Sequence, residues 1–387
     1  MKLVALFALI IFTSFSFAQS KLDLDSLIVA NATTFKGGAQ YSGKGWDLLL
    51  EKARRTNYVL IGEDHFIAEV PLFTQALAQN LKIENYICEM DQWMMDIFRN
   101  KITTLKEDQL NQWITTNYNG FSFFQKKNEF ALMQDLLKQK VNLIGTEQVG
   151  LMSTTIVLQY LIETGSPKNK KSYTIMQDSS NSANNRFFAD YSKAFFMNTP
   201  FFSESIGKLD KASMKADEAE LIAAMVRSSE IYKTGSHRSR IKLMQSNLMK
   251  ASSALKGKKN LFKFGANHMI KGESYIPVYD IGTTAHIMAQ SENQDSYHIL
   301  ILPKGGVQAG FLTGSNPIQL TEEPYASLKP FFQKSSDTDW TFIDFEKVRA
   351  AIHKKEFALN NPVLEKTISG YDALVVIPSA SAAETIR

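Results

Sequence analysis

The chain has almost no cysteine, since Cys88 is the only one among 387 residues. A single thiol cannot form an internal disulfide or a CxxC pair. The surrounding sequence, YICEM, is apolar, which favours a buried and inert thiol over a nucleophile. Cysteine chemistry is therefore not expected to carry the function.

Long hydrophobic runs are missing beyond the first 18 residues, so no stable membrane insertion is expected. Residues 1–18 themselves join Lys2 to a short apolar stretch that ends in small residues at Ser16 and Ala18, the pattern of a secretory signal peptide. No cysteine follows this stretch, which argues against a lipoprotein. We expect an exported protein, periplasmic or secreted, whose mature part is 19–387.

An excess of charge of one sign is also missing, because 43 basic residues face 39 acidic ones. The basic residues are scattered and no aromatic-interleaved basic groove accompanies them, so no nucleic acid partner is expected. The chain lacks a G-x-S-x-G nucleophile elbow, a P-loop and an HExxH motif. A small-molecule substrate remains the expected partner, and the sequence identifies no partner protein.

What the chain does have is an alternation of short apolar runs and amphipathic segments. Such alternation predicts an α/β fold with a mixed or mostly parallel central sheet flanked by helices. The expected strands are 58–62, 86–90, 141–145, 261–265, 298–302 and 373–377, and the expected helices are 46–55, 71–81, 127–139, 151–163 and 238–255.

The gap between the strands at 141–145 and 261–265 is too long for one crossover and carries only helical patterns. We therefore expect a helical insertion at about 150–235 that caps the strand ends of a single domain spanning 19–387. The insertion contains an aromatic-rich stretch at 185–202. This stretch forms either the insertion's own core or an apolar lid over a ligand crevice.

Two of the six histidines repeat one pattern, an apolar strand followed by Gly-x-x-His. VLIGEDH ends at His65 and FKFGANH ends at His268. In an open α/β sheet, residues just past the carboxyl ends of the strands line the ligand crevice. The pattern therefore predicts that the two imidazoles lie at the same edge of the sheet.

Carboxylates follow three of the expected strands. Glu63 lies two residues before His65, Glu89 and Asp91 follow the strand at 86–90, and Glu147 follows the strand at 141–145. A neutral histidine can take a proton from water while a carboxylate orients it.

The same type of residue set can bind a divalent metal, through His65, His268 and Glu63. Asp64 and Glu69 have an alternative interpretation as acids at a helix N-terminus. Asp91 and Glu147 are equally consistent with a structural role.

In these segments the sequence resembles the erythromycin esterase-like family, within a larger grouping that also holds the haem-binding ChaN-like and the Tiki/TraB proteins. Arg240, Met244 and Asn247 repeat the family's Arg-x3-Met-x2-Asn spacing. The matching segments follow one another in family order over most of the mature chain: LIGEDHFIAE, YICEMD, EFALMQDLLKQKVNLIGTE, RIKLMQSNLMKA, KFGANHMIKG, ILILPKGGVQAGF, WTFIDFEKVR and GYDALVVIPSASAAE.

The resemblance implies an exported hydrolase that activates water without a covalent serine and cleaves an ester or related bond. It implies that His65 is the general base, that Glu63 and Glu89 orient it, and that Arg240 and His268 steady the substrate or the oxyanion. The substrate-binding residues that we expect around this catalytic group are Glu69, Asp91, Glu147, Asn247 and Asn267.

Two departures from the esterase pattern argue against a macrolide lactone as the substrate. Gly62 precedes His65 by one residue fewer than is usual in the esterases, which is the form of the ChaN-like and Tiki branches. The basic residue that the macrolide esterases are expected to have in the helix after this histidine is also missing, since no Arg or Lys follows His65 before Lys82. The alternative function is a haem- or metal-binding uptake protein of the ChaN-like type without catalysis, and a family member with only a structural role is a third reading.

Overall fold

An eight-stranded sheet forms the centre of the computed structural model, which describes residues 23–310, 315–321, 323–354, 356 and 359–386. The expected signal peptide at 1–18 lies outside the described residues. The strand order is β1-β9-β10-β6-β2-β5-β3-β4. The strands of this sheet are β1 (Ala32–Phe35), β2 (Tyr58–Glu63), β3 (Asn85–Cys88), β4 (Asn142–Gly145), β5 (Asn260–Gly265), β6 (Ser296–Pro303), β9 (Trp340–Asp344) and β10 (Ala373–Ile377).

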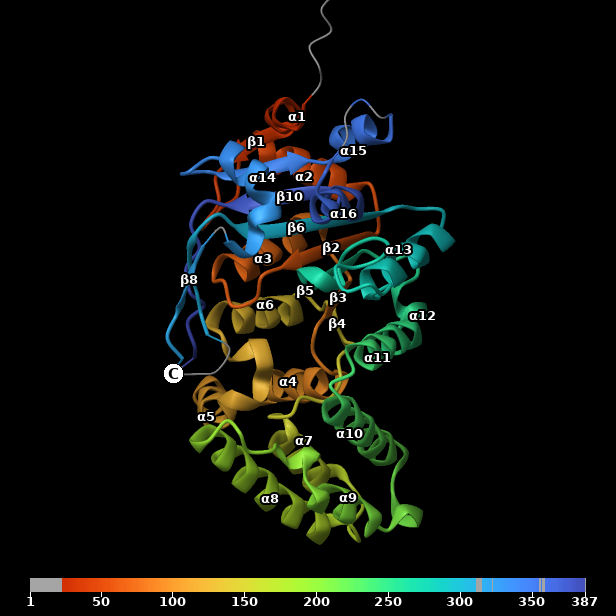
Figure 1. The fold of residues 1–387 in the computed structure, drawn as a ribbon. Coiled ribbons are helices and arrows are strands. Elements are labelled where there is room, and N and C mark those ends of the chain that lie inside the picture. Colours follow the sequence, from red (N-terminus) through yellow and green to blue (C-terminus); the bar gives the residue numbers. More distant parts are fainter. Residues whose placement is uncertain (1–22, 311–314, 322, 355, 357–358, 387) are drawn as a thin grey trace, which may run out of the picture.

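The six strands from β10 to β4 are parallel, whereas β9 runs antiparallel to both β10 and β1. All six strands predicted from the sequence are present, and the mostly parallel α/β fold is confirmed. The two strands of this sheet that were not predicted, β1 and β9, lie at one edge. Figure 1 labels β1, the outermost strand. The remaining described strands, β7 (Gly306–Gln308) and β8 (Ile318–Leu320), form a separate antiparallel pair.

Apolar layers cover both faces of the sheet. In β2, Val59 and Ile61 pack into one core, and Tyr58 and Leu60 pack into the other. Successive side chains of a strand point to opposite faces, so a central strand between two layers of helices must be apolar throughout. This explains why the central strands are recognisable as short unbroken apolar runs.

Helices surround the sheet, and the five predicted ones are present as α2 (Lys44–Arg54), α3 (Glu69–Leu81), α6 (Lys127–Lys138), α7 (Thr154–Thr164) and α11 (His237–Lys250). Other described helices of the α/β body are α1 (Leu24–Asn31), α4 (Gln92–Thr104), α5 (Glu107–Asn117), α12 (Ser252–Leu255), α13 (Ile281–Ser291), α14 (Lys329–Lys334), α15 (Glu346–His353) and α16 (Pro362–Gly370). Short 3-10 segments include η1 (Tyr118–Gln125) and η4 (Ala266–His268).

The region 150–235 is helical throughout its regular structure, with α7, α8 (Lys170–Ala189), α9 (Pro200–Gly207) and α10 (Ala216–Thr234). In Figure 1 these helices form a lobe beyond the β4 edge of the sheet, and α10 leads back toward α11. Within the aromatic stretch, Phe196 and Phe202 are buried in the hydrophobic core. These two rings therefore have the position expected of core residues, which is the first of the two interpretations of this stretch.

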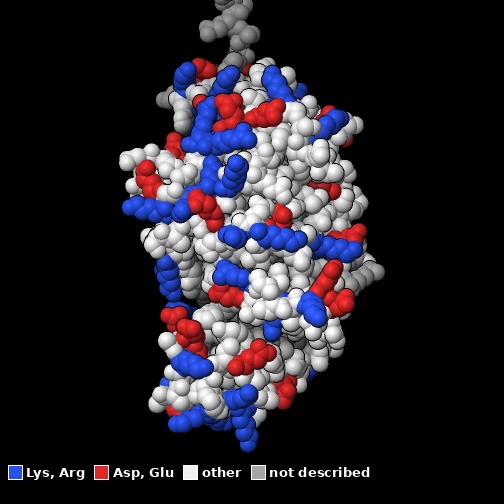
Figure 2. All heavy atoms as spheres, turned by 180° about the vertical axis from the view of Figure 1, so that it is seen from behind, with Lys and Arg blue, Asp and Glu red and all other residues white. Residues whose placement is uncertain are grey.

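Charged side chains of both signs are mixed on the face shown in Figure 2, without a large area of one sign. Among the described residues, no helix combines the length and the apolarity needed to cross a membrane.

Candidate active site

The carboxyl ends of four parallel strands meet at one edge of the sheet, in the order β2, β5, β3, β4. Glu63 ends β2, Glu89 directly follows β3, and Glu147 lies two residues past β4. Beyond β5 the chain turns into η4, whose last residue is His268. The parallel arrangement thus brings the predicted acids and histidines to the same edge.

His65 lies between two carboxylates. Its Nδ1 is 2.8 Å from Oε1 of Glu63, and its Nε2 is 3.4 Å from Oε2 of Glu89. On one side its ring packs against Phe123 of η1, with a centroid separation of 4.5 Å. The side chain keeps 25% of its surface exposed, so water can reach it.

The charges around His65 favour its protonated form. Burial lowers the pKa of His65, but the hydrogen bonds and charges of Glu63 and Glu89 outweigh burial and raise it to about 10. For Glu63 and Glu89, burial raises the pKa, and the neighbouring cations bring it below the usual carboxyl range. His65 is therefore an imidazolium at neutral pH, and it can act as a base only after that proton has left.

Arg240 of α11 contacts side chains that follow three different strands. Its Nη2 donates to Oε1 of Glu89 at 2.6 Å, and its Nε donates to Oε2 of Glu147 at 2.9 Å. Its Nη1 lies 3.3 Å from Nε2 of His268. Burial lowers the pKa of the guanidinium, but the two carboxylates raise it further than burial lowers it, so the charge is permanent.

A buried lysine contacts Glu63, the acid next to His65. Lys263 in β5 is 5% exposed, and its Nζ donates to Oε1 of Glu63 at 2.7 Å and to Oε1 of Glu129 at 2.6 Å. The sequence interpretation missed Lys263 and Glu129. A lysine inside the apolar run NLFKFG was the available signal, because a buried lysine needs a carboxylate partner.

Both glycines of the repeated pattern lie where a side chain would collide. A Cβ on Gly62 would approach the hydroxyl of Tyr371 to 2.5 Å, and a Cβ on Gly265 would approach Nε2 of His65 to 2.8 Å. Their role is therefore steric, since Gly62 leaves room for Tyr371 and Gly265 leaves room for His65.

Of four expected substrate-binding residues, three are placed mainly by contacts within the fold and one is exposed. Asn247 donates to the carbonyl of Thr146 at 2.9 Å, and Glu69 accepts from the backbone N–H of Ser381. Asn267 is exposed. Asp91, the fourth, caps the N-terminus of α4 through Met94 N–H at 2.9 Å.

Asp64 does not begin a helix, because α3 starts at Glu69, whose place in the first turn fits its predicted role as an N-terminal acid. The Oδ2 atom of Asp64 is buried without a hydrogen-bond partner among the described residues. Burial raises its pKa to about 6.

A third histidine, which the sequence interpretation left unassigned, lies beside His268. His237 is the first residue of α11, and its ring centroid is 5.6 Å from that of His268. Burial, together with the charges of His268 and Arg240, lowers the pKa of His237. Its position three residues before Arg240 in a helical pattern was the signal that could have revealed it.

Solved structures share the fold of this chain. A mutant of erythromycin esterase EreC in its open conformation matches with a TM-score of 0.61 at 13% identity, covering 92% of this chain and 99% of that one. The chain has the erythromycin esterase fold. A Bacillus cereus protein (TM-score 0.55, 13% identity, 93% and 98% covered) and a succinoglycan biosynthesis protein (0.56, 15%, 94% and 98%) share it. No family model and no curated protein sequence matches the chain.

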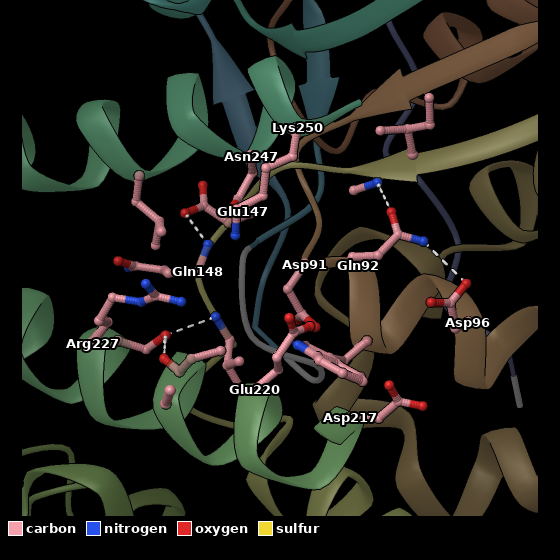
Figure 3. A pocket seen from close by; sticks show the side chains of 18 of the residues that line it. Asp91, Gln92, Asp96, Glu147, Gln148, Asp217, Glu220, Arg227, Asn247 and Lys250 are labelled. Atoms are coloured by element: carbon pink, nitrogen blue, oxygen red, sulfur yellow. Dashed lines mark hydrogen bonds between the residues drawn. The ribbon is translucent and has the colours of Figure 1, made fainter. Parts of the chain in front are cut away.

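Two cavities adjoin the site of this esterase-type fold. One of about 400 Å³ is lined by Glu89, Arg240, His237 and Phe123, and by residues at the end of α10. The other, of about 780 Å³, is drawn in Figure 3 and lies between α4, β4, α10 and α11. Asp91, Glu147 and Gln148 line both, so the two cavities share a wall. Neither lining includes a residue of the aromatic stretch at 185–202.

A group that could bind a metal ion is present, and its members differ from those predicted. His237, His268 and Asp280 each offer a ligand atom, and these atoms lie within 4.8 Å of one another. In the predicted set of His65, His268 and Glu63, the carboxylate is already bound to Lys263 as well as to His65. That set stays a prediction.

Proposed function

We propose that the chain is an exported hydrolase of the erythromycin esterase type that cleaves an ester or related bond of a small molecule. The observation that carries the proposal is the position of His65, held between Glu63 and Glu89 at the strand ends. Its neighbours Glu89 and Phe123 line the 400 Å³ cavity. The fold supports the class of reaction, and the N-terminal sequence pattern supports export.

In this proposal His65 transfers the proton. Once its Nε2 has lost the proton that it shares with Glu89, the neutral imidazole can take a proton from the attacking water. Glu63 at Nδ1 then holds the ring orientation and stabilises the imidazolium that forms. The same proton can pass to the leaving alkoxide, so no covalent enzyme intermediate is needed.

Arg240 and His268 would stabilise the charge that develops on the carbonyl oxygen. The Nε and Nη2 groups of Arg240 are held by carboxylates, which leaves Nη1 as the donor directed toward His268. A fixed donor at the position of a developing oxyanion lowers the barrier more than a mobile one. The anchoring carboxylates, Glu89 and Glu147, therefore preorganise this donor.

The 780 Å³ cavity would hold the part of the substrate that does not react. It offers the rings of Trp93 and Tyr160, as pockets for small molecules commonly do. Five acidic side chains and two basic ones line it. Glu147 is paired with Arg240 and Asp91 has a raised pKa, which leaves Asp96, Asp217 and Glu220 against Arg227 and Lys250. This balance favours a neutral or cationic substrate over an anionic one.

A panel of activated esters and lactones tests the proposal, with each compound supplied in neutral, ammonium-bearing and carboxylate-bearing forms. We expect turnover, with the carboxylate-bearing forms as the poorest substrates. His65→Ala should abolish turnover while the circular dichroism spectrum is retained, and the exposed His353→Ala is the matched control.

Haem titration tests the alternative function, a haem-binding uptake protein without catalysis. Absence of turnover across the panel, together with a Soret band on haem titration, would contradict the hydrolase proposal and support a haem-binding protein.

A further inference from the structure

One imidazole near the active site has an unexplained buried nitrogen. The Nε2 atom of His237 is buried without a hydrogen-bond partner among the described residues. A buried polar atom without a partner destabilises the fold, so such an atom in a native structure indicates a ligand, water or ion that binds it. The atom belongs to the same residue group, with His268 and Asp280, whose ligand atoms cluster within 4.8 Å.

We propose that His237, His268 and Asp280 bind one divalent cation. Asp280 is fully buried and His268 is 5% exposed, so both are held in place by the surrounding fold. The Oδ1 atom of Asp280 accepts the backbone N–H of Ile281 at 2.6 Å, which fixes the carboxylate at the start of α13. Two ligands are thus preformed, and His237 at the start of α11 supplies the third.

The charges around the group favour a cation. The carboxylate of Asp280 contacts Nδ1 of His268 at 2.9 Å, and Glu89 lies 3.6 Å from Nε2 of the same ring. The opposing charge is Arg240, whose Nη1 is 3.3 Å from that Nε2 and which is itself bound to Glu89 and Glu147. Glu89 and Glu147 both pair with this guanidinium. The negative charge of Asp280 is therefore left to offset the positive charge of the ion.

Binding would replace one proton. At present a proton joins Nδ1 of His268 to Oδ2 of Asp280, and the ion would take its place while the proton is released to solvent. The ring would keep its other proton on Nε2, 3.6 Å from Oε1 of Glu89, so it changes from an imidazolium to a neutral imidazole when the ion binds. We therefore expect affinity to fall as pH decreases, because the ion competes with that proton.

The donor set identifies the class of ion. Two imidazole nitrogens and one carboxylate oxygen suit Zn²⁺ and the neighbouring transition metals better than Mg²⁺ or Ca²⁺, which prefer oxygen ligands. Three protein ligands leave at least one position for water. The inference does not rest on the proposed hydrolase function, because it concerns the binding of an ion and not turnover.

Titration of the untagged protein with Co²⁺, followed by its visible d–d absorption, tests the proposal. We expect one saturable equivalent that Zn²⁺ displaces and Mg²⁺ does not. His237→Gln and Asp280→Asn should each weaken binding at least tenfold. The substitution of Asp280 keeps a side-chain oxygen for the cap of α13, and that of His237 lies at the surface end of α11, so both variants should fold.

His65→Gln and Glu63→Gln are the matched controls, because they remove ligands of the alternative metal set while His268 is common to both. Unchanged Co²⁺ binding in these two variants supports the proposed site. Loss of binding in the controls but not in His237→Gln would overturn the proposal and indicate that the ion binds His65 and Glu63. Absence of saturable binding by the parent protein, or equal binding by all variants, would also overturn the proposal.

Discussion

The imidazole Nε2 of His65 lies 3.4 Å from Oε2 of Glu89, although the strands that carry them are not neighbours. His65 follows β2, Glu89 follows β3, and β5 runs between the two. β5 ends at Gly265, whose missing side chain leaves the space in which the two groups meet. Its backbone N–H also donates to Oε2 of Glu89 at 2.9 Å.

Gly265→Ala should therefore damage the site while sparing the fold. The new Cβ would lie 2.8 Å from Nε2 of His65 and 3.6 Å from Oε2 of Glu89, which forces the ring away from the acid. The backbone φ of −54° suits alanine, so the melting temperature should change little. We expect kcat/KM on the best ester to fall on the order of 10²-fold, since misplacement by about 1 Å can cost that much.

Gly207→Ala in α9 is the control, because a Cβ there meets nothing within 4 Å. If Gly265→Ala kept full activity, contact between His65 and Glu89 would not be needed for turnover.

The pH dependence of turnover reports the role of His65. Burial lowers its pKa, but Glu63 and Glu89 raise it to about 10, so the neutral base becomes available only at alkaline pH. We expect kcat/KM to rise up to about pH 10 in the wild-type protein, and the rise to move to lower pH in Glu89→Gln, which removes one stabilising charge. The measurement is an initial-rate profile from pH 6 to pH 11.

A profile that instead falls as pH passes through about 10 would make the imidazolium the active form. His65 would then be the acid and not the base.

The central strands could be predicted because burial on both faces leaves short apolar runs such as VLIG in β2. β1 could not, since half of its short sequence ATTF is polar and it pairs only with β9, about three hundred residues later in the chain. β9 contains the apolar and threonine run WTFI, but it pairs antiparallel with both of its neighbours and so lies outside the parallel strand–helix pattern. Edge pairing depends on the tertiary structure more than on local sequence.

The candidate site could be predicted as far as residues at strand ends are concerned. Glu63, His65, Glu89 and His268 follow from one rule, that ligand crevices form at the carboxyl ends of parallel strands. Lys263, His237 and Phe123 do not follow from it. Their contacts join a strand interior, a helix start and a 3-10 segment to the site, and only the packed structure brings these elements together.

Lys263 is expected to control stability as well as the charge of Glu63. Lys263→Met leaves the carboxylates of Glu63 and Glu129 buried without their shared cation. Removal of one partner of a buried ion pair costs about 3–5 kcal/mol. We expect a loss of that order in the free energy of unfolding, measured by urea denaturation, and a smaller loss when Glu129→Gln is added, because one buried charge then disappears.

The control is Lys127→Met, which breaks an exposed pair with Glu384. That change should cost no more than about 1 kcal/mol. If Lys263→Met were no more destabilising than Lys127→Met, then Lys263, Glu63 and Glu129 would not carry the charges that their contacts indicate.

Asp91 should make the protein less stable as pH rises from about 4 to about 7. Burial raises the pKa of its carboxyl to about 7, and Glu147 adds to that effect, while the bond from Met94 opposes it. The unfolded chain ionises near pH 4, so it loses the proton first, and stability falls between about pH 4 and pH 7 before it levels off. Asp91→Asn removes this loss and keeps the cap of α4, since asparagine caps helices as well as aspartate.

We therefore expect Asp91→Asn to unfold at a higher temperature than wild type at pH 8, with a difference that shrinks as the pH is lowered to 4. Each pKa unit corresponds to about 1.4 kcal/mol, so the gain should reach a few kcal/mol. The control is Asp23→Asn at the exposed cap of α1, where hydrogen bonds from Ser26 lower the pKa of the acid. The stability that Asp23 contributes is lost as pH falls, so its pH dependence has the opposite sign. Parallel pH trends in the two variants would contradict a raised pKa for Asp91.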